Sequence, residues 1–225
     1  MAEALYAEGE HVGYGDILSA EYAQSEETHQ AVLYFNDQGE RIGYYAPDGS
    51  SIKKIFLKSP MRFARISSRF QLKRFHPILK VRRPHLGVDY AAPRGTPVRS
   101  IGEGVVIFAG RRGGGGKTIK IRHNAIYQTN YLHLNGYARG IRKGKKVKQG
   151  QVIGFVGSTG LATGPHLHFE FYKNGRFVDP LRQKFPSAKP IAKKELPAFK
   201  LATSKFLNLL PKWRLPNSIS SHAEN

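Results

Sequence analysis

Two histidines stand two residues apart within residues 164–170, at the start of a run in which polar and apolar side chains alternate. In a β-strand, side chains at positions i and i+2 leave the same face. His166 and His168 are therefore expected to point into one groove, while Leu167 and Phe169 pack on the other side. Two imidazoles on one face form a site geometry rather than a packing pattern, and metal binding is the chemistry that they offer.

Further ligand types lie upstream, in the segment from His85 to Asp89. Gly87 and the β-branched Val88 argue against a helix there, and in an extended chain His85 and Asp89 share a face. A catalytic zinc ion typically takes three protein ligands and leaves a fourth position to water. His85, Asp89 and one histidine of the downstream pair would supply that set.

Short β-strands are expected to position these side chains. Strand-like runs separated by turn residues cover residues 105–109, 118–121, 127–134 and 152–156. His133 stands in the third run, in a strand-like alternation, and is a further candidate for the same groove. The glycine-rich residues 113–117 lead into a β-branched strand instead of a helix, which favours a hairpin tip over a phosphate-binding loop. The pattern predicts a mainly β fold with a compact antiparallel β-sheet domain.

Four segments carry a resemblance to a known family. The His85-x-x-x-Asp89 motif within residues 83–98, the glycine-containing segments 150–154 and 157–160, and the paired histidines of 164–170 resemble the lysostaphin-type, or LytM-type, zinc endopeptidases of bacterial cell walls. The resemblance runs from about residue 60 to residue 181. The segment from residue 15 to residue 70 is similar to the subgroup of Gram-negative murein D,D-endopeptidases typified by MepM.

The resemblance implies a role for each candidate residue. His85, Asp89 and His168 would hold Zn²⁺, and His133 and His166 would lie beside the metal as catalytic residues. One of these two would take the proton from the attacking water, and the other would stabilise the oxyanion or protonate the leaving amine. The resemblance does not say which histidine does which.

The implied activity is that of a zinc metalloendopeptidase that hydrolyses peptide crosslinks of bacterial peptidoglycan. The MepM-like subgroup implies the bond between D-alanine and meso-diaminopimelate, which is cut during cell-wall growth and remodelling. Two alternatives stay open: cleavage of glycine bridges, as in the lysostaphin branch, and noncatalytic activation of a wall amidase, as in relatives that have lost zinc ligands. Every ligand position is filled in this sequence, which argues for catalysis.

The charge of the chain implies an anionic partner or surface. Lys and Arg total 36 against 16 Asp and Glu, which gives a net charge of +20. No nucleic-acid-binding motif accompanies this charge, so a nucleic-acid partner is the weakest hypothesis. The densest basic run, residues 139–148, either steers an acidic wall polymer or forms a solvated loop, and peripheral contact with anionic envelope surfaces is a further possibility.

Three parts are expected along the chain. Residues 1–60 read as a small β-rich accessory module, with a hairpin of 31–35 and 41–45 and a third strand within 52–57. Residues 61–185 are the expected LytM-type peptidase domain, and 186–225 a basic tail with a short helix. Partial helical spacing is found in that helix for the apolar residues Leu201, Phe206, Leu209 and Leu210. We expect the helix to dock on a domain, and a membrane-surface role is the alternative because Trp213 lies nearby. The accessory module is expected to brace or partly cover the groove.

The sequence holds no cysteine and no apolar run of about 18 residues, the length that spans a bilayer. Its first residues lack the charged start and apolar segment of a signal peptide. Since the resemblance implies an exported protein of the periplasm or cell envelope, either a signal peptide has been removed or the chain begins partway through a longer precursor, and we expect the second.

Overall fold

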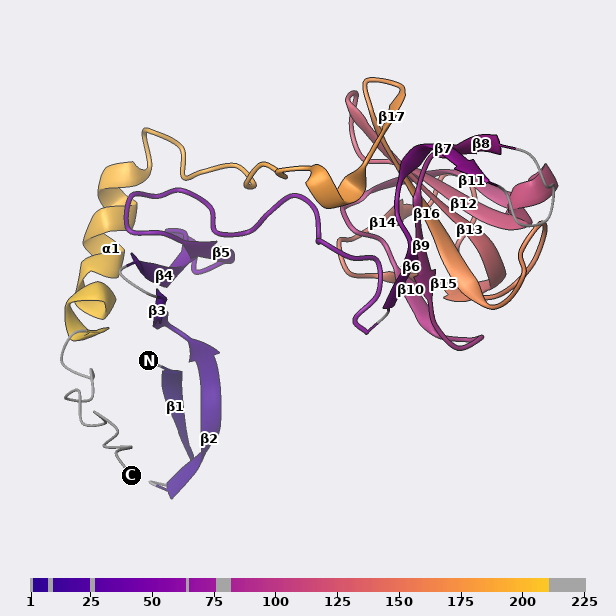
Figure 1. Ribbon diagram of the computed structural model, residues 1–225. Coiled ribbons are helices and arrows are strands. Elements are labelled where there is room, and N and C mark those ends of the chain that lie inside the picture. The colour runs from indigo at the N-terminus through magenta and orange to yellow at the C-terminus, as the bar shows by residue number, and fades with distance from the viewer. Residues whose placement is uncertain (1, 8–9, 25–26, 64, 76–81, 211–225) are drawn as a thin grey trace, which may run out of the picture. The chain divides into compact units, whose positions relative to one another are not determined.

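The structure is a computed structural model that describes residues 2–7, 10–24, 27–63, 65–75 and 82–210 (Figure 1). The expected role of Trp213 therefore falls outside the described residues. The chain divides into two compact units, one made of residues 1–54 with 187–225 and the other of residues 55–186. The functional division into accessory module, peptidase domain and tail stays a prediction.

Residues 55–186 form a ten-stranded sheet in which every pairing is antiparallel. The central path runs β14-β11-β12-β13-β16-β9-β6, with β10, β15 and β17 attached beside it (Figure 1). The strands of this sheet are β6 (Arg65–Ser68), β9 (Val88–Ala91), β10 (Pro97–Arg99), β11 (Gly104–Arg111), β12 (Lys117–Arg122), β13 (Tyr127–Tyr137), β14 (Lys146–Val147), β15 (Val152–Val156), β16 (His166–Lys173) and β17 (Arg176–Val178). A short hairpin of β7 (Gln71–Phe75) and β8 (Arg82–His85) and the 3₁₀ turns η1 (Gly113–Gly115) and η2 (Pro180–Arg182) complete the unit.

The mainly β prediction is confirmed, and the four strand-like runs correspond to β11, β12, β13 and β15. The glycine-rich residues before β12 form a tight turn between β11 and β12, as expected for a hairpin tip. Burial alternates along β16, where Leu167, Phe169 and Phe171 lie in the core and the intervening polar residues do not. This alternation turns one face of the sheet into the hydrophobic core and leaves the other free to carry polar side chains.

The other unit holds a small core of its own. A hairpin of β1 (Ala2–Ala7) and β2 (Glu10–Ile17) precedes a three-stranded sheet of β3 (Ser19–Gln24), β4 (Glu27–Phe35) and β5 (Arg41–Tyr45). Helix α1 (Leu196–Leu209) packs on β4, and Phe199 contacts the rings of Tyr34 and Tyr45 edge-on. The expected hairpin of 31–35 and 41–45 is confirmed, as is the docking of the helix on a domain.

Two expectations for this unit are wrong. Residues 52–57 contain only an isolated bridge at Lys54 and no strand. Leu201 is 80% exposed, while Phe199 and Thr203 are the buried helix residues. Phe206 packs against the core of this unit and Leu210 is buried, as expected, but Phe199 is buried where Leu201 was expected, because its ring fits between two tyrosines. The described helices are all too short or too polar to span a bilayer.

Candidate metal centre

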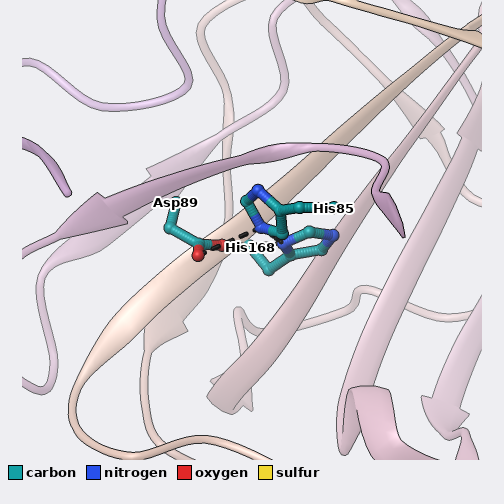
Figure 2. Close-up of side chains that lie close together, drawn as sticks. All are labelled: His85, Asp89 and His168. Atoms are coloured by element: carbon teal, nitrogen blue, oxygen red, sulfur yellow. Dashed lines mark hydrogen bonds and ion pairs between the residues drawn. The ribbon is translucent and has the colours of Figure 1, made fainter. Parts of the chain in front are cut away.

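Three neighbouring strands bring the predicted ligands together (Figure 2). In the pairing of β16 with β9, His168 lies directly opposite Asp89, so both side chains leave the same face. His85, the last residue of β8, reaches the same spot from the hairpin beside the sheet. Ligand atoms of His85, Asp89 and His168 all lie within 4.8 Å of one another.

The contacts among these three side chains are short. His168 Nδ1 lies 2.7 Å from Asp89 Oδ1 and 3.1 Å from His85 Nε2. His85 Nε2 lies 3.0 Å from Asp89 Oδ2. Each residue thus directs one nitrogen or carboxylate oxygen toward a common point.

In each imidazole, the hydrogen bond made by the outer nitrogen, which points away from the cluster, determines whether the inner nitrogen, which points into the cluster, can bind a metal ion. His85 Nδ1 donates to the carbonyl oxygen of Arg69 at 2.8 Å, since a carbonyl can only accept. His168 Nε2 faces Glu170 Oε1 at 3.4 Å and carries its proton on that side. The inner nitrogens, His85 Nε2 and His168 Nδ1, both lie beside the carboxylate of Asp89, so a proton or a metal ion must occupy the space that they share. A donor set of two imidazole nitrogens and one carboxylate fits zinc.

The electrostatics of the cluster point the same way. Burial by itself raises the pKa of Asp89, but hydrogen bonds from His168 and His85 outweigh burial and hold the pKa well below its ordinary value. Burial lowers the pKa of His168, yet its contacts with Asp89 and Glu170 raise it to about 9. At neutral pH His168 therefore carries a proton that faces Asp89. A metal ion can bind among the three residues by displacing this proton.

A buried polar network holds His168 from behind. Glu170 Oε2 accepts hydrogen bonds from Asn130 Nδ2 and from the hydroxyl of Tyr172, while Oε1 faces His168. Burial raises the pKa of Glu170, but these donors, His168 first, lower it overall. The network fixes the tautomer of His168 that leaves Nδ1 free for a ligand.

Gly87, between the two upstream ligands, leaves room for the imidazole of His168. A Cβ atom on Gly87 would lie 2.7 Å from His168 Cε1 and 2.6 Å from the carbonyl oxygen of Phe169. Side chains do not tolerate such distances, so only glycine allows β8 and β9 to pass this close to the ring.

His133 reaches the site through a β-bulge and not through regular alternation. Between the pairs Ile119–Tyr131 and Lys117–Leu134, β13 uses three steps where β12 uses two. Tyr131 and Leu134 both remain in the core. His133 has a φ of 60°, the left-handed conformation, and this extra residue turns its imidazole onto the polar face.

The rings of His133 and His166 lie side by side, with centroids 4.8 Å apart. His133 Nδ1 donates to the carbonyl oxygen of Thr159 at 2.8 Å, and His166 Nδ1 donates to that of Gly164 at 2.9 Å. Each ring therefore has an unprotonated Nε2 when it is neutral, and His166 Nε2 lies 3.9 Å from Asp89 Oδ1. Burial lowers the pKa of His133 to about 4, which keeps this imidazole neutral at physiological pH.

Comparison with known proteins identifies the family of the domain that carries these residues. Residues 83–180 match the model of peptidase family M23. The peptidoglycan DD-endopeptidase ShyC of Vibrio cholerae is 40% identical over 192 residues, which cover 85% of this chain and 43% of that protein. The chain belongs to peptidase family M23. The resemblance to LytM-type zinc endopeptidases is thereby confirmed.

Other M23 relatives extend the comparison. The DD-carboxypeptidase/endopeptidase Mpg of Neisseria meningitidis is 42% identical over 191 residues, which cover 83% of this chain and 44% of that protein. A solved zinc containing peptidase from Vibrio cholerae has 34% sequence identity and a TM-score of 0.56, and the match covers 81% of this chain and 55% of the other. This M23 chain spans less than half the length of the two curated relatives.

The M23 structure thus brings all five candidate residues onto one polar face, with three in mutual contact and two imidazoles beside them. Sequence reasoning did not single out the network of Glu170, Asn130 and Tyr172. The signal was available, because Glu170 and Tyr172 continue the i, i+2 series of His166 and His168 along the same strand.

Proposed function

We propose that this M23 protein is a zinc-dependent endopeptidase that hydrolyses peptide crosslinks of bacterial peptidoglycan, at the bond between D-alanine and meso-diaminopimelate. The observation that carries the proposal is the convergence of three ligand atoms, from His85, Asp89 and His168, beside two further imidazoles. The relative ShyC, a peptidoglycan DD-endopeptidase, suggests the class of substrate, and the DD-carboxypeptidase/endopeptidase Mpg suggests the same type of activity.

The proposed metal ligands are His85 Nε2, Asp89 and His168 Nδ1. A zinc ion held by them would lower the pKa of a bound water and polarise the carbonyl of the scissile bond. The protein's own contribution to proton transfer comes from the Nε2 atoms of His133 and His166. Because carbonyl oxygens hold the Nδ1 protons of both rings, each Nε2 can take a proton from the attacking water or return one to the leaving amine.

The proposed substrate places the protein outside the cytoplasm, in the periplasm or cell envelope. Its positive charge favours accumulation on an anionic wall or on other anionic envelope surfaces. Glycine-bridge cleavage is the second candidate, since the five site residues do not by themselves select a crosslink. A protein that only activates an amidase would not need zinc ligands, whereas this chain has all three, so catalysis is the better-supported function.

The test is mass spectrometry of purified crosslinked muropeptides incubated with the zinc-loaded protein. Conversion of diaminopimelate-linked dimers to monomers is expected, with loss of conversion in His168→Ala and after chelation with EDTA. His166→Ala adds a variant that keeps the proposed ligands, and it should bind zinc normally while losing turnover. Intact dimers after incubation with folded, zinc-loaded protein would refute the proposed substrate, and cleavage of glycine-bridged peptides instead would select the second candidate.

A further inference from the structure

Two basic side chains converge on Asn135, which follows His133 by two residues on β13. Arg94 Nε and Nη2 both donate to Asn135 Oδ1, at 2.9 and 2.7 Å. Lys117 Nζ donates to the backbone carbonyl of Asn135 at 2.7 Å. These three bonds hold the guanidinium and the ammonium group against one residue.

The position of this pair follows from the strands. Along β9 the chain passes Asp89, then Ala91 opposite His166, and then continues to Arg94. The backbone of Asn135 packs on Gly157, where an added Cβ would lie 2.3 Å from Asn135 N. Gly157 in turn accepts a hydrogen bond from the backbone N–H of His166. The two cations therefore lie past the imidazoles of His133 and His166, at the end of the site away from Glu170.

The charge of this pair is not neutralised by the described part of the protein. Neither Arg94 nor Lys117 forms an ion pair with an acidic side chain of the described residues. The guanidinium has five N–H donors, and Asn135 occupies two of them. Arg94 is exposed, so its remaining donors are open to a ligand.

We propose that Arg94 and Lys117 form a subsite for a free carboxylate of the stem peptide. This inference rests on the proposed function. Diaminopimelate carries an amine and a carboxyl group on each of two carbons, so acylation of one amine by D-alanine leaves a carboxylate free beside the scissile nitrogen. An arginine that is already fixed in place binds a carboxylate with little loss of side-chain entropy.

The subsite would also explain selection between crosslinks. An internal glycine–glycine bond has no free carboxylate on the carbon next to its nitrogen. The cations beside the two imidazoles would therefore favour the diaminopimelate crosslink over a glycine bridge, a preference that the zinc site cannot provide by itself. Arg94 is a specificity-determining residue in this proposal.

The test compares three crosslinked dimers as substrates of the full chain. The first dimer has all carboxylates free, the second is amidated at the diaminopimelate carboxylate beside the crosslink, and the third is amidated at its terminal D-alanine. Wild type is expected to show a KM about tenfold or more higher for the second dimer, in line with the loss of a charge-assisted hydrogen bond. A higher KM for the third dimer alone would assign the subsite to the terminal carboxylate.

The variant Arg94→Gln should raise KM for the free dimer about tenfold, leave kcat nearly unchanged and abolish the discrimination between free and amidated dimers. Arg176→Gln, which removes one charge from an exposed position on β17, is the matched control and should change neither value. Binding of the same dimers to EDTA-treated protein, measured by calorimetry, gives a second readout that does not depend on turnover.

Three results bear against the subsite. Equal KM values of wild type for all three dimers would overturn it and leave the proposed function standing. An equal loss in Arg94→Gln and Arg176→Gln would show that net charge alone acts. Failure of wild type to cleave any of the dimers would overturn the proposed function and the subsite together.

Discussion

Glu170 is the residue through which the metal affinity of this site can be tested most directly. Its replacement by alanine leaves His168 Nε2 and Asn130 Nδ2 without the acceptor that Glu170 provides in the buried network. The proton of His168 can then move to Nδ1, the proposed ligating atom. Loss of such a partner typically weakens metal binding by about 10- to 100-fold, and we expect the upper end, about 2.7 kcal/mol, because the network is buried.

Glutamine at this position should have a smaller effect, about tenfold or 1.4 kcal/mol. Its amide oxygen can still accept from His168, and its NH₂ group would face Asn130. The buried Oδ1 of Asn130 has no hydrogen-bond partner among the described residues, so a turn of that amide supplies an acceptor for the new NH₂ group. Only the charge of Glu170 is then lost.

Competition titration of zinc against a chromophoric chelator measures both affinities, and ¹⁵N NMR of the histidines reports the tautomer of His168 directly. Glu103→Gln, which alters an exposed carboxylate, is the control. Unchanged zinc affinity in Glu170→Ala, or an equal loss in the control, would refute the role given to the network.

Three further outcomes are expected. Gly87→Ala should lower stability by about 1–3 kcal/mol and weaken zinc binding, because the new Cβ meets His168 and a backbone carbonyl, and urea unfolding of the metal-free protein measures the first effect. In metal-free protein the pKa of His133 is about 4, against 6.5 for a free imidazole, so protonation of His133 opposes folding. The neutral imidazole contributes fully to the free energy of unfolding above about pH 6.5, and about 3 kcal/mol of this stability is lost as the pH falls toward 4. Unfolding measured at pH 7 and pH 4.5 should show this loss in wild type but not in His133→Asn. Replacing Lys143, Lys145 and Lys146, all exposed, by glutamine should reduce co-sedimentation with purified cell walls by more than half at low salt, and a difference that persists at high salt would count against electrostatic attraction.

The sequence predicted the site well where spacing alone determines geometry. The i, i+2 rule places His166 and His168 on one face, and the pairing of β16 with β9 then requires only that His168 meet Asp89. The strands around them were likewise readable, because each is a short β-branched or aromatic run between turns.

Other features depend on contacts that no local pattern contains. Regular alternation along β13 would put His133 beside Tyr131 in the core, and the bulge that prevents this is visible only in the register with β12. The convergence of Arg94 and Lys117 on Asn135 joins residues 41 and 18 positions apart. Likewise, the burial of Phe199 instead of Leu201 on α1 depends on contacts with Tyr34 and Tyr45, which lie far away in the sequence.

The left-handed backbone at His133 has a consequence for how this protein would change under selection. Most side chains other than glycine and asparagine destabilise such a conformation, typically by about 1 kcal/mol, and burying an imidazole adds a further cost at low pH. The strand would therefore be more stable without this histidine, which places activity and stability in opposition at one position. A lineage released from the need to hydrolyse its substrate would be expected to exchange His133 for glycine or asparagine and to gain a more stable fold by doing so.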